Sequence, residues 1–301
     1  MPPWTAADIP PQRGRVFLVT GGSSGLGAEV TLALCAAGAE VILTCRDEER
    51  GRAVAAAAQG PVQVRHLDLA DLASVRTFAE GLTEPVDVLI NNAGVMAVPH
   101  SVTADGFERH IGTNHLGPFA LTGLLLDRVR DRVVTVTSGL HRLGRVRPDD
   151  LHFTRRRYQR WLAYAQSKLA NLLFAYELER RFDNAGPPPP DPESRTPGPI
   201  SLAAHPGVAA TEGQRRDTSF QGRLLAGGRA QPPAMGALPL LYAATAADAA
   251  GGTCIGPDGL FQRNGHPETV ATSVRSHDTK TARRLWEESE RATGVRYPTG
   301  G

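Results

Sequence analysis

Lysine is nearly absent from this sequence, because only Lys168 and Lys280 are lysines among its 33 basic residues. An arginine guanidinium keeps its proton under ordinary conditions. A lysine ammonium is a compact charge with three rotatable donors, so arginine cannot replace it where a small cation must lie beside a phenol. Lys168 lies four residues after Tyr164, and this pair therefore stands out from the rest of the chain.

Long runs of one charge and long apolar runs are also missing. The 33 basic and 31 acidic side chains give a formal net charge of +2, which offers little support for a nucleic-acid surface. No apolar run approaches the ~18 residues of a membrane span, and prolines interrupt the start where a signal peptide needs its apolar region. We expect a small-molecule partner, no nucleic acid and no membrane span.

Cysteine is scarce, and Cys35, Cys45 and Cys254 show no CxxC spacing. Scattered cysteines in odd number indicate reduced thiols, and therefore a cytoplasmic protein without a zinc site. No metal is predicted.

The chain is long enough for one large domain, since it has 301 residues of which 41% are hydrophobic. We expect this domain at residues 15–293, between an N-terminal arm (1–14) and a C-terminal tail (294–301). The proline-rich residues 186–199 are predicted to form a surface loop and not a domain boundary, because strand and helix alternation resumes at ISLAAHPGV.

The N-terminal part has the pattern of a dinucleotide-binding βαβ unit. A strand (RVFLVT) leads into the glycine-rich turn TGGSSGLG, a helix to about Ala37, and a second strand, EVILTC. Such a turn brings backbone N–H groups and a helix N-terminus to a pyrophosphate. The predicted contacts in the turn are Gly21, Ser23, Ser24, Gly25, Leu26 and Gly27.

The end of the second strand bears on the choice of cofactor. Binding of NAD usually places an acidic residue there, but this chain has Cys45 and Arg46. A guanidinium can grip a 2′-phosphate, so we predict NADP(H) in preference to NAD(H), with NAD(H) still possible. Alternatively, Arg46 is a solvated side chain that opens the RDEER run.

Two further strands end at the same predicted sheet edge, where open α/β sheets bind ligands. VQVRHL leads to Asp68 and Leu69, and VDVLI leads to the NNAG motif. In that motif Asn91, Ala93 and Gly94 are the predicted cofactor contacts.

Tyr164 and Lys168 carry the predicted chemistry. Residues four apart share one face of a helix, here predicted over Trp161 to Arg181, so the phenol and the ammonium are neighbours. The adjacent cation is expected to lower the pKa of the tyrosine and make it a proton donor. A YxxxK pair on an amphipathic helix is also common without any catalytic role.

Ser138 follows the strand RVVTVT at the same edge. Its hydroxyl can donate to the substrate oxygen that Tyr164 also contacts, giving two donors for the developing charge. The alternative is a serine that only forms a turn.

Asn114 lies in a predicted helix, roughly Ala104 to Val129, four residues before Pro118. Proline has no N–H, so the carbonyl of Asn114 is left free and a kink is expected. This carbonyl is predicted to hold a water that reaches Lys168 as a proton relay. The alternative is a bend that serves packing.

After a sixth predicted strand, Pro206 and Gly207 force a turn. Val208 is expected to meet the nicotinamide carboxamide, and Thr211 to reach the carboxamide or the phosphates. His205 is interpreted as a structural residue.

The order TGGSSGLG, NNAG, Asn114, Ser138, YAQSK and HPGV resembles the short-chain dehydrogenase/reductase family over nearly the whole chain. LTCRD, NHLGPFALTGLLL, SKLANLLFAYELERRF and RRLWEESERATGV are similar to the branch that contains retinol dehydrogenases. Two features depart from the family pattern: the proline-rich insertion is long, and Thr137 stands where many relatives have a second serine. We expect neither to touch the catalytic residues.

The resemblance implies an α/β fold, a single doubly wound Rossmann-like domain with a parallel sheet of about seven strands. It implies a substrate lid at residues 208–235, a homo-oligomer, and contacts of Lys168 with the nicotinamide ribose. The implied catalytic residues are Asn114, Ser138, Tyr164 and Lys168.

The implied activity is NADP(H)-dependent hydride transfer, in the direction that reduces a lipophilic ketone or aldehyde. One alternative is NAD(P)-dependent alcohol oxidation. Another is an NADP-binding sensor or scaffold without turnover, although such proteins commonly lose the tyrosine or the lysine.

Overall fold

The computed structural model describes residues 3–183, 198–209 and 230–298. Thr211, most of the expected lid (208–235) and most of the proline-rich loop (186–199) lie outside the described residues. Eight strands form one sheet in the order β3-β2-β1-β4-β5-β6-β7-β8. Their bounds are β1 Val16–Thr20, β2 Glu40–Cys45, β3 Val62–His66, β4 Val86–Asn91, β5 Val129–Val136, β6 Ile200–Ala204, β7 Cys254–Pro257 and β8 Pro267–Thr269.

Strands β1 to β7 pair in parallel, as expected, and β8 adds an antiparallel edge. The strands are almost wholly apolar in the centre, since a parallel sheet is covered on both faces. The chain order reverses between β1 and β4. In open α/β sheets this switch point opens a crevice at the carboxyl ends of the strands.

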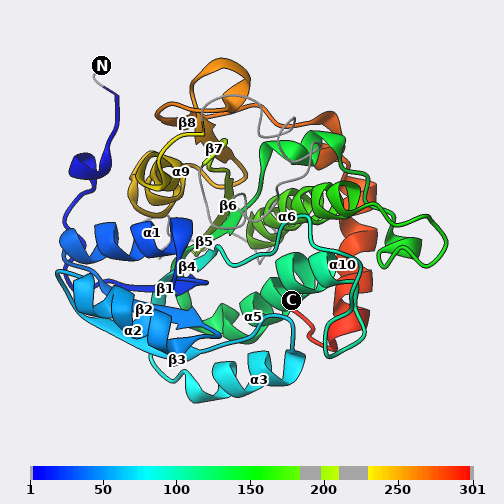
Figure 1. Ribbon diagram of the computed structural model, residues 1–301, viewed down its shortest axis with the longest axis horizontal. Coiled ribbons are helices and arrows are strands. Elements are labelled where there is room, and N and C mark those ends of the chain that lie inside the picture. Colours follow the sequence, from blue (N-terminus) through cyan, green and yellow to red (C-terminus); the bar gives the residue numbers. More distant parts are fainter. Residues whose placement is uncertain (1–2, 184–197, 210–229, 299–301) are drawn as a thin grey trace, which may run out of the picture.

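Helices cover both faces of the sheet (Figure 1). One core packs α1 and α9 against it, and a second core packs α3, α5, α6 and α10 against the other face. The helix bounds are α1 Gly25–Ala36, α2 Glu48–Ala57, α3 Leu72–Gly81, α4 Arg109–Ile111, α5 Gly117–Leu125, α6 Arg160–Asp183, α9 Pro233–Thr245 and α10 Thr279–Thr293.

The apolar residues of α5 and α6 face the interior of this chain. Leu121, Leu125, Leu172 and Leu173 are at most 1% exposed. The hydrophobic character of these two helices is therefore accounted for by packing within this chain, against the sheet and against neighbouring helices.

The prediction of one long helix from Ala104 to Val129 is wrong, because the structure divides this stretch into several elements. The chain instead forms the short helix α4, the π-helix η2 (Gly112–Leu116) and then α5. Pro118 lacks an N–H, and the N–H of Gly117 reaches back five residues to the carbonyl of Gly112. The expected bend is therefore a π-helical segment, and it carries Asn114.

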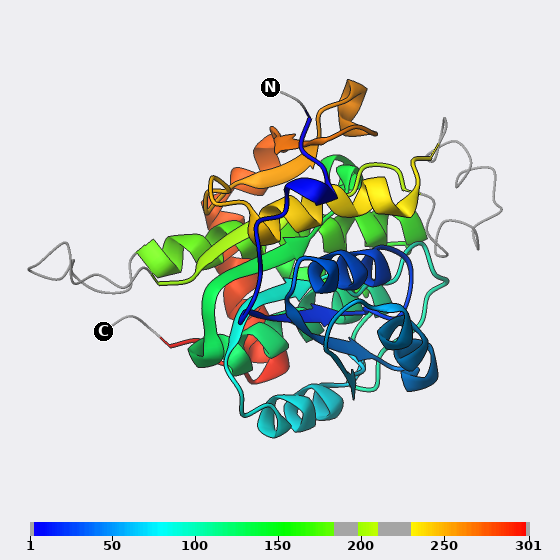
Figure 2. The same ribbon diagram turned by 90° about the vertical axis from the view of Figure 1, so that its left-hand side faces the viewer.

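Both ends of the described chain pack against the domain. Trp4 contacts Tyr242 of α9 edge-on, with ring centroids 5.3 Å apart, and the N-terminal segment runs over α9 (Figure 2). At the other end, Val295 and Tyr297 are each 5% exposed, and the Tyr297 hydroxyl donates to the carbonyl of Phe119. The packed domain thus extends past the boundary expected at residue 293, because these side chains complete the second core.

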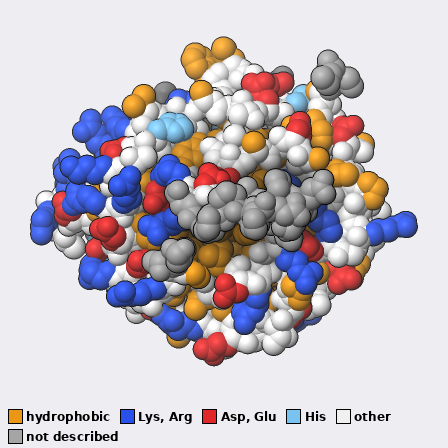
Figure 3. All heavy atoms as spheres, turned by 180° about the vertical axis from the view of Figure 1, so that it is seen from behind, with side chains coloured by type: hydrophobic (Ala, Val, Ile, Leu, Met, Phe, Trp, Pro, Cys, Tyr) orange, Lys and Arg blue, Asp and Glu red, His pale blue; other side chains and the backbone are white. Residues whose placement is uncertain are grey.

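Charged side chains of both signs are mixed on the face shown in Figure 3, with Lys and Arg densest along one edge. This mixture agrees with the small formal net charge of +2. In the part of the chain that the structure describes, no helix combines the length and apolar character needed to span a membrane.

Candidate active site

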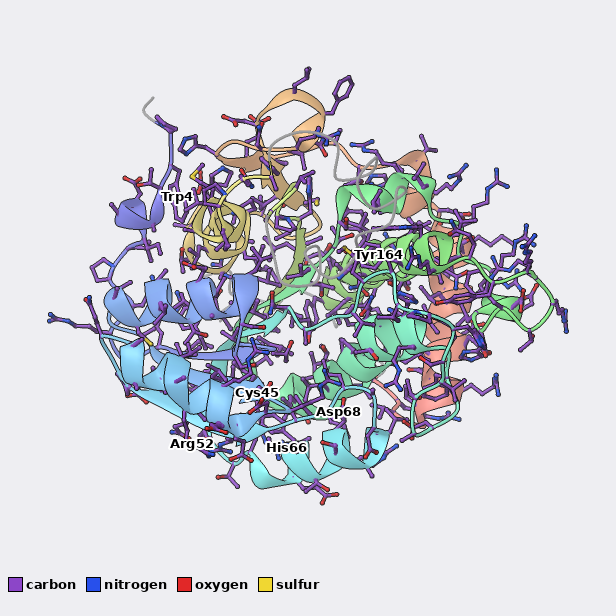
Figure 4. The ribbon with its side chains drawn as sticks, viewed as in Figure 1. Trp4, Cys45, Arg52, His66, Asp68 and Tyr164 are labelled. Carbon is purple, nitrogen blue, oxygen red and sulfur yellow. The ribbon has the colours of Figure 1, made fainter. Side chains whose placement is uncertain are left out.

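A groove of about 1280 Å³ lies at the carboxyl ends of the strands, where the chain order reverses. In Figure 4, Cys45 and Asp68 lie at one side of this opening and Tyr164 lies across from them. Most of the predicted cofactor contacts line it: Gly21, Ser23, Ser24, Gly25, Leu26, Gly27, Arg46, Asp68, Leu69, Ala93, Gly94, Tyr164, Lys168, Pro206, Gly207 and Val208.

The glycine-rich turn has the geometry that its sequence predicts. Gly21 has φ +66°, in the left-handed region that favours glycine. A Cβ on Gly27 would lie 2.3 Å from the carbonyl oxygen of Gly21, so only glycine lets α1 approach the turn so closely. Ser24 is the N-cap of α1, and its side chain makes no capping bond. The N-terminus of α1 is thus available to an anion.

Asn91 was predicted to contact the cofactor, but it does not line the groove. It is 2% exposed, and its amide donates to the Thr122 hydroxyl on α5. Asn92 lines the groove instead, and its Nδ2 donates to the carbonyl of Thr20 at 2.8 Å. Residues alternate between the two faces at the end of β4, which places the second asparagine of NNAG beside the glycine turn.

Arg46 follows β2 and lines the groove with an exposed side chain. Arg50, in the first turn of α2, lines the groove as well. Arg50 is not among the contacts predicted from the sequence. Its signal was its position four residues after Arg46, which places both guanidinium groups at the same end of the groove.

Tyr164 lies in α6 and is 8% exposed. Burial raises its pKa to about 12, and a hydrogen bond with Ser138 partly opposes that rise. The expected lowering of the tyrosine pKa is therefore wrong for the protein alone, since the loss of water around the phenol sets the direction of the shift. Tyr164 keeps its proton at neutral pH and can donate it.

Lys168 is the predicted neighbour of Tyr164. Its Nζ lies 5.9 Å from the centroid of the tyrosine ring and donates to the carbonyl of Val136 at 3.0 Å. Burial lowers the pKa of this ammonium to about 8. The pair therefore lies on one face of α6, as the four-residue spacing predicts.

Thr137 does touch one of the predicted catalytic residues, contrary to expectation. Its hydroxyl donates to the main-chain carbonyl of Lys168 at 2.8 Å, which ties the end of β5 to α6. The hydroxyl at the position of the second serine thus holds the main chain of Lys168 in place relative to the end of β5.

Ser138 follows β5 and lines the groove. It is the N-cap of the 3-10 helix Gly139–Leu143, where its Oγ accepts from the N–H of Leu140 at 3.3 Å. Its carbonyl receives a bond from the His141 ring at 2.8 Å. The capping role and the donor role in the groove are therefore both open to this residue.

Asn114 lies behind the groove and is fully buried. Its side-chain amide pairs with both main-chain groups of Val95, at 2.7 Å and 2.9 Å, and donates to the Ser167 hydroxyl. A Cβ on Gly94 would lie 3.0 Å from Asn114 Oδ1 and 3.6 Å from Lys168 Nζ. The bare backbone of Gly94 keeps this space open. The water relay through the Asn114 carbonyl stays a prediction.

His205 is confirmed as a structural residue. It is fully buried, it accepts from the N–H of Gly207 at 3.2 Å, and its other ring nitrogen contacts Gln262. Burial lowers its pKa to about 4, so it carries no charge at neutral pH.

An apolar cluster beside the tyrosine was also missed. Ala97, Trp161 and Tyr164 pack together, with Met96 and Leu140 against them. Ala97 comes from the irregular chain after β4, so no periodic pattern in the sequence marked it. These side chains give the groove one apolar wall next to the phenol.

The groove fits a nicotinamide dinucleotide. It has a close glycine turn and an uncapped helix N-terminus for phosphates, and the open space at Gly94 lies beside Lys168. Tyr164 and Ser138 supply two hydroxyl groups near that space. Such an arrangement can place a carbonyl or alcohol oxygen against two donors while its carbon faces a nicotinamide.

Comparison with known proteins agrees with this geometry. The short chain dehydrogenase family model matches residues 15–148. Human (Homo sapiens) retinol dehydrogenase 13 is 39% identical, covering 95% of this chain and 86% of the relative. Polyprenol dehydrogenase of Mus musculus is 40% identical, also covering 95% and 86%.

Solved structures share the fold as well. A crystal structure of an uncharacterised protein from Mycobacterium paratuberculosis has a TM-score of 0.84 and 46% identity, covering 98% of this chain and 99% of that one. Pseudomonas aeruginosa RhlG, solved as an NADP active-site complex, has a TM-score of 0.62 and 26% identity, covering 83% and 97%. With its glycine turn, tyrosine and lysine on one groove, this chain belongs to the short-chain dehydrogenase/reductase family, in its retinol dehydrogenase-like branch, and is an NAD(P)-binding oxidoreductase of alcohol and carbonyl groups.

Proposed function

We propose that the protein is an NADP(H)-dependent reductase of a lipophilic ketone or aldehyde. The observation that carries this proposal is the position of Ser138, Tyr164 and Lys168 on the groove that the glycine turn opens. The apolar wall beside Tyr164 suits a lipophilic substrate. The names of the retinol and polyprenol dehydrogenases, which are similar to this chain, point to substrates of the same character.

When bound, the reduced nicotinamide supplies a hydride to the carbonyl carbon. Tyr164 holds its proton at neutral pH, because burial raises its pKa to about 12, and gives it to the oxygen as negative charge develops there. Ser138 contacts the same oxygen and orients it. Lys168 stabilises the phenolate that remains after the proton has left.

Two arginines support the choice of NADP(H). Arg46 and Arg50 line the end of the groove at β2 and α2. No acidic side chain occupies position 46, although Asp47 follows directly as the N-cap of α2. Two guanidinium groups suit a 2′-phosphate, and a reductase direction is consistent with NADPH as the donor.

Replacing Arg46 by Ala is expected to raise the Kd for NADPH roughly 10–100-fold, because charge-assisted bonds to the phosphate are lost. The Kd for NADH should stay within about twofold. Isothermal titration with both cofactors measures the two changes. Arg52→Ala is the matched control, since Arg52 is an exposed arginine on the neighbouring helix α2 (Figure 4) that pairs with Glu48. Equal weakening of NADPH and NADH in Arg46→Ala would remove the assignment.

The pH dependence of reduction should follow Lys168. Its pKa is lowered to about 8 by burial, so the ammonium is present below that pH and is lost above it. We expect kcat/KM to fall above pH about 8, approaching tenfold per pH unit as only the protonated enzyme is active. A profile that stays flat to pH 10 would show that the charge of Lys168 in the free enzyme is not needed.

Two alternative functions predict different experimental results. An enzyme that works in the oxidative direction binds and consumes the oxidised cofactor more effectively. A sensor or scaffold binds NADPH and turns nothing over. An NADPH-depletion screen over aldehydes, steroid-like ketones and polyketide-like ketones separates these cases, with Tyr164→Phe as the blank. Tight NADPH binding without depletion by any carbonyl would favour the sensor.

We also propose that the protein is cytoplasmic and, as the family resemblance implies, a homo-oligomer, although α5 and α6 bury their apolar residues within this chain. Cys35, Cys45 and Cys254 are buried thiols that form no disulfide, which suits a reducing compartment. Light scattering on the purified protein tests the oligomeric state.

A further inference from the structure

One buried polar cluster near the groove has no role in the chemistry described so far. Glu108 and His110 are fully buried, and Tyr158 is half-buried beside them. Glu108 is the N-cap of α4, and its Oε1 contacts His110 Nδ1 at 2.8 Å. The Tyr158 hydroxyl lies 3.2 Å from the same ring nitrogen. These three groups meet behind the segment that carries Ala97.

The contacts fix the direction of each hydrogen bond. His110 Nε2 accepts from the main-chain N–H of Val98 at 3.2 Å, so the ring proton is on Nδ1 and points to Glu108. The Tyr158 hydroxyl donates to the carbonyl of Val98 at 3.1 Å, the shorter of its two acceptor contacts, with Glu108 Oε1 at 3.4 Å. Both main-chain groups of Val98 are therefore bonded to side chains of this cluster.

Val95 is bonded in the same way by Asn114, whose amide pairs with both of its main-chain groups. Residues 95–98, which we call the strap, are thus held at each end by a side chain from α4 or η2. His110 and Asn114 are four residues apart, about one helical turn, and they bond to Val98 and Val95, which are three residues apart. The helical segment that carries Asn114 therefore also supplies the second attachment, through His110.

The middle of the strap needs such attachment. Ala97 has φ +49°, a left-handed conformation that is uncommon for residues other than glycine. A residue held there persists only where its surroundings determine its position. Ala97 is 5% exposed and packs on Trp161 and Tyr164, and all four strap residues line the groove. The His110 ring itself lies 6.2 Å from the Tyr164 ring, edge-on.

We propose that His110, oriented by Glu108 and assisted by Tyr158, is a positioning residue that fixes the strap against Tyr164. The strap then forms the substrate-side wall at a set distance from the phenol. Loss of the His110 bond lets Ala97 leave its left-handed conformation, which misplaces both the wall and the substrate carbonyl. The effect on turnover rests on the proposed function, whereas the effect on the strap does not.

His110→Phe tests the proposal, because it keeps a buried ring and removes the acceptor for Val98. We expect amide exchange of the strap, followed by mass spectrometry, to become about tenfold faster. The kcat for a carbonyl substrate should fall about tenfold through misplacement, while the Kd for NADPH stays within about twofold. His110→Gln offers an amide oxygen to the Val98 N–H and should restore part of both properties.

His115→Phe is the matched control. His115 is a buried histidine of the adjoining π-helix whose Nε2 contacts Ser289, away from the strap. It should leave strap exchange and kcat within about twofold of the wild type. Unchanged strap exchange in His110→Phe would overturn the proposal whatever the activity, and so would faster exchange with unchanged kcat. If the wild-type protein reduces no carbonyl, the proposed function fails, and the exchange measurement still decides whether His110 holds the strap.

Discussion

Tyr164→Phe is expected to lower kcat by about 10²–10⁴-fold, the range that a positioned general acid contributes. The substitution keeps the ring and removes only the hydroxyl. Tyr164 is 8% exposed and packs against Ala97 and Trp161, so the variant should fold and keep this cluster. The Kd for NADPH should change little, because the glycine turn and Arg46 remain. Single-turnover oxidation of NADPH with a saturating carbonyl substrate measures the loss at the chemical step.

Tyr176→Phe provides the comparison within the same helix. Tyr176 is 4% exposed, and its hydroxyl contacts Thr272 at 3.2 Å, away from the residues that line the groove. Its kcat should stay within about twofold of the wild type. If Tyr164→Phe retained a tenth or more of the wild-type kcat, another group or water would have to supply the proton.

Lys168→Met is expected to produce the second largest effect, a loss in kcat of about a hundredfold. With the phenolate charge placed at the Tyr164 ring centroid, 5.9 Å from Nζ, the two opposite charges attract by roughly 3 kcal/mol at an effective dielectric constant of 20. This attraction arises only as the phenol gives up its proton, so it stabilises the transition state and not the bound ground state. Methionine keeps most of the buried volume and carries no charge.

The sequence offers an unusual control for this prediction, since Lys280 is the only other lysine. It lies exposed in the first turn of α10. Lys280→Met should leave kcat and the pH profile as in the wild type, whereas Lys168→Met should also lose the decline above pH about 8. A decline that survives in Lys168→Met would belong to a different group.

Local rules explain why much of the site was predictable. The turn TGGSSGLG requires glycine wherever φ is positive or a Cβ would collide, and Gly21 and Gly27 show both requirements. The four-residue spacing fixes Tyr164 and Lys168 on one face of any helix. Strands that alternate with helices imply a parallel sheet, whose carboxyl ends collect the loops at one edge. Each inference depends only on neighbours along the chain.

The predictions that proved wrong depend instead on contacts between distant parts of the chain. The sign of the Tyr164 pKa shift depends on how much water burial removes, which the sequence spacing does not show. Whether Asn91 or Asn92 faces the groove depends on the exact end of β4 and on the partner Thr122 in α5. The bend at Asn114 was expected from Pro118, but its π-helical form depends on which carbonyl the N–H of Gly117 reaches.

By itself, the sequence determined the βαβ order, the glycine turn and the tyrosine and lysine on one helix face, because these follow from backbone geometry and short spacings. Only the tertiary structure decided the protonation of Tyr164 and the attachment of the strap by His110 and Asn114. Both depend on groups far apart along the chain, which exclude water and complete one another's hydrogen bonds only after the sheet and helices have packed.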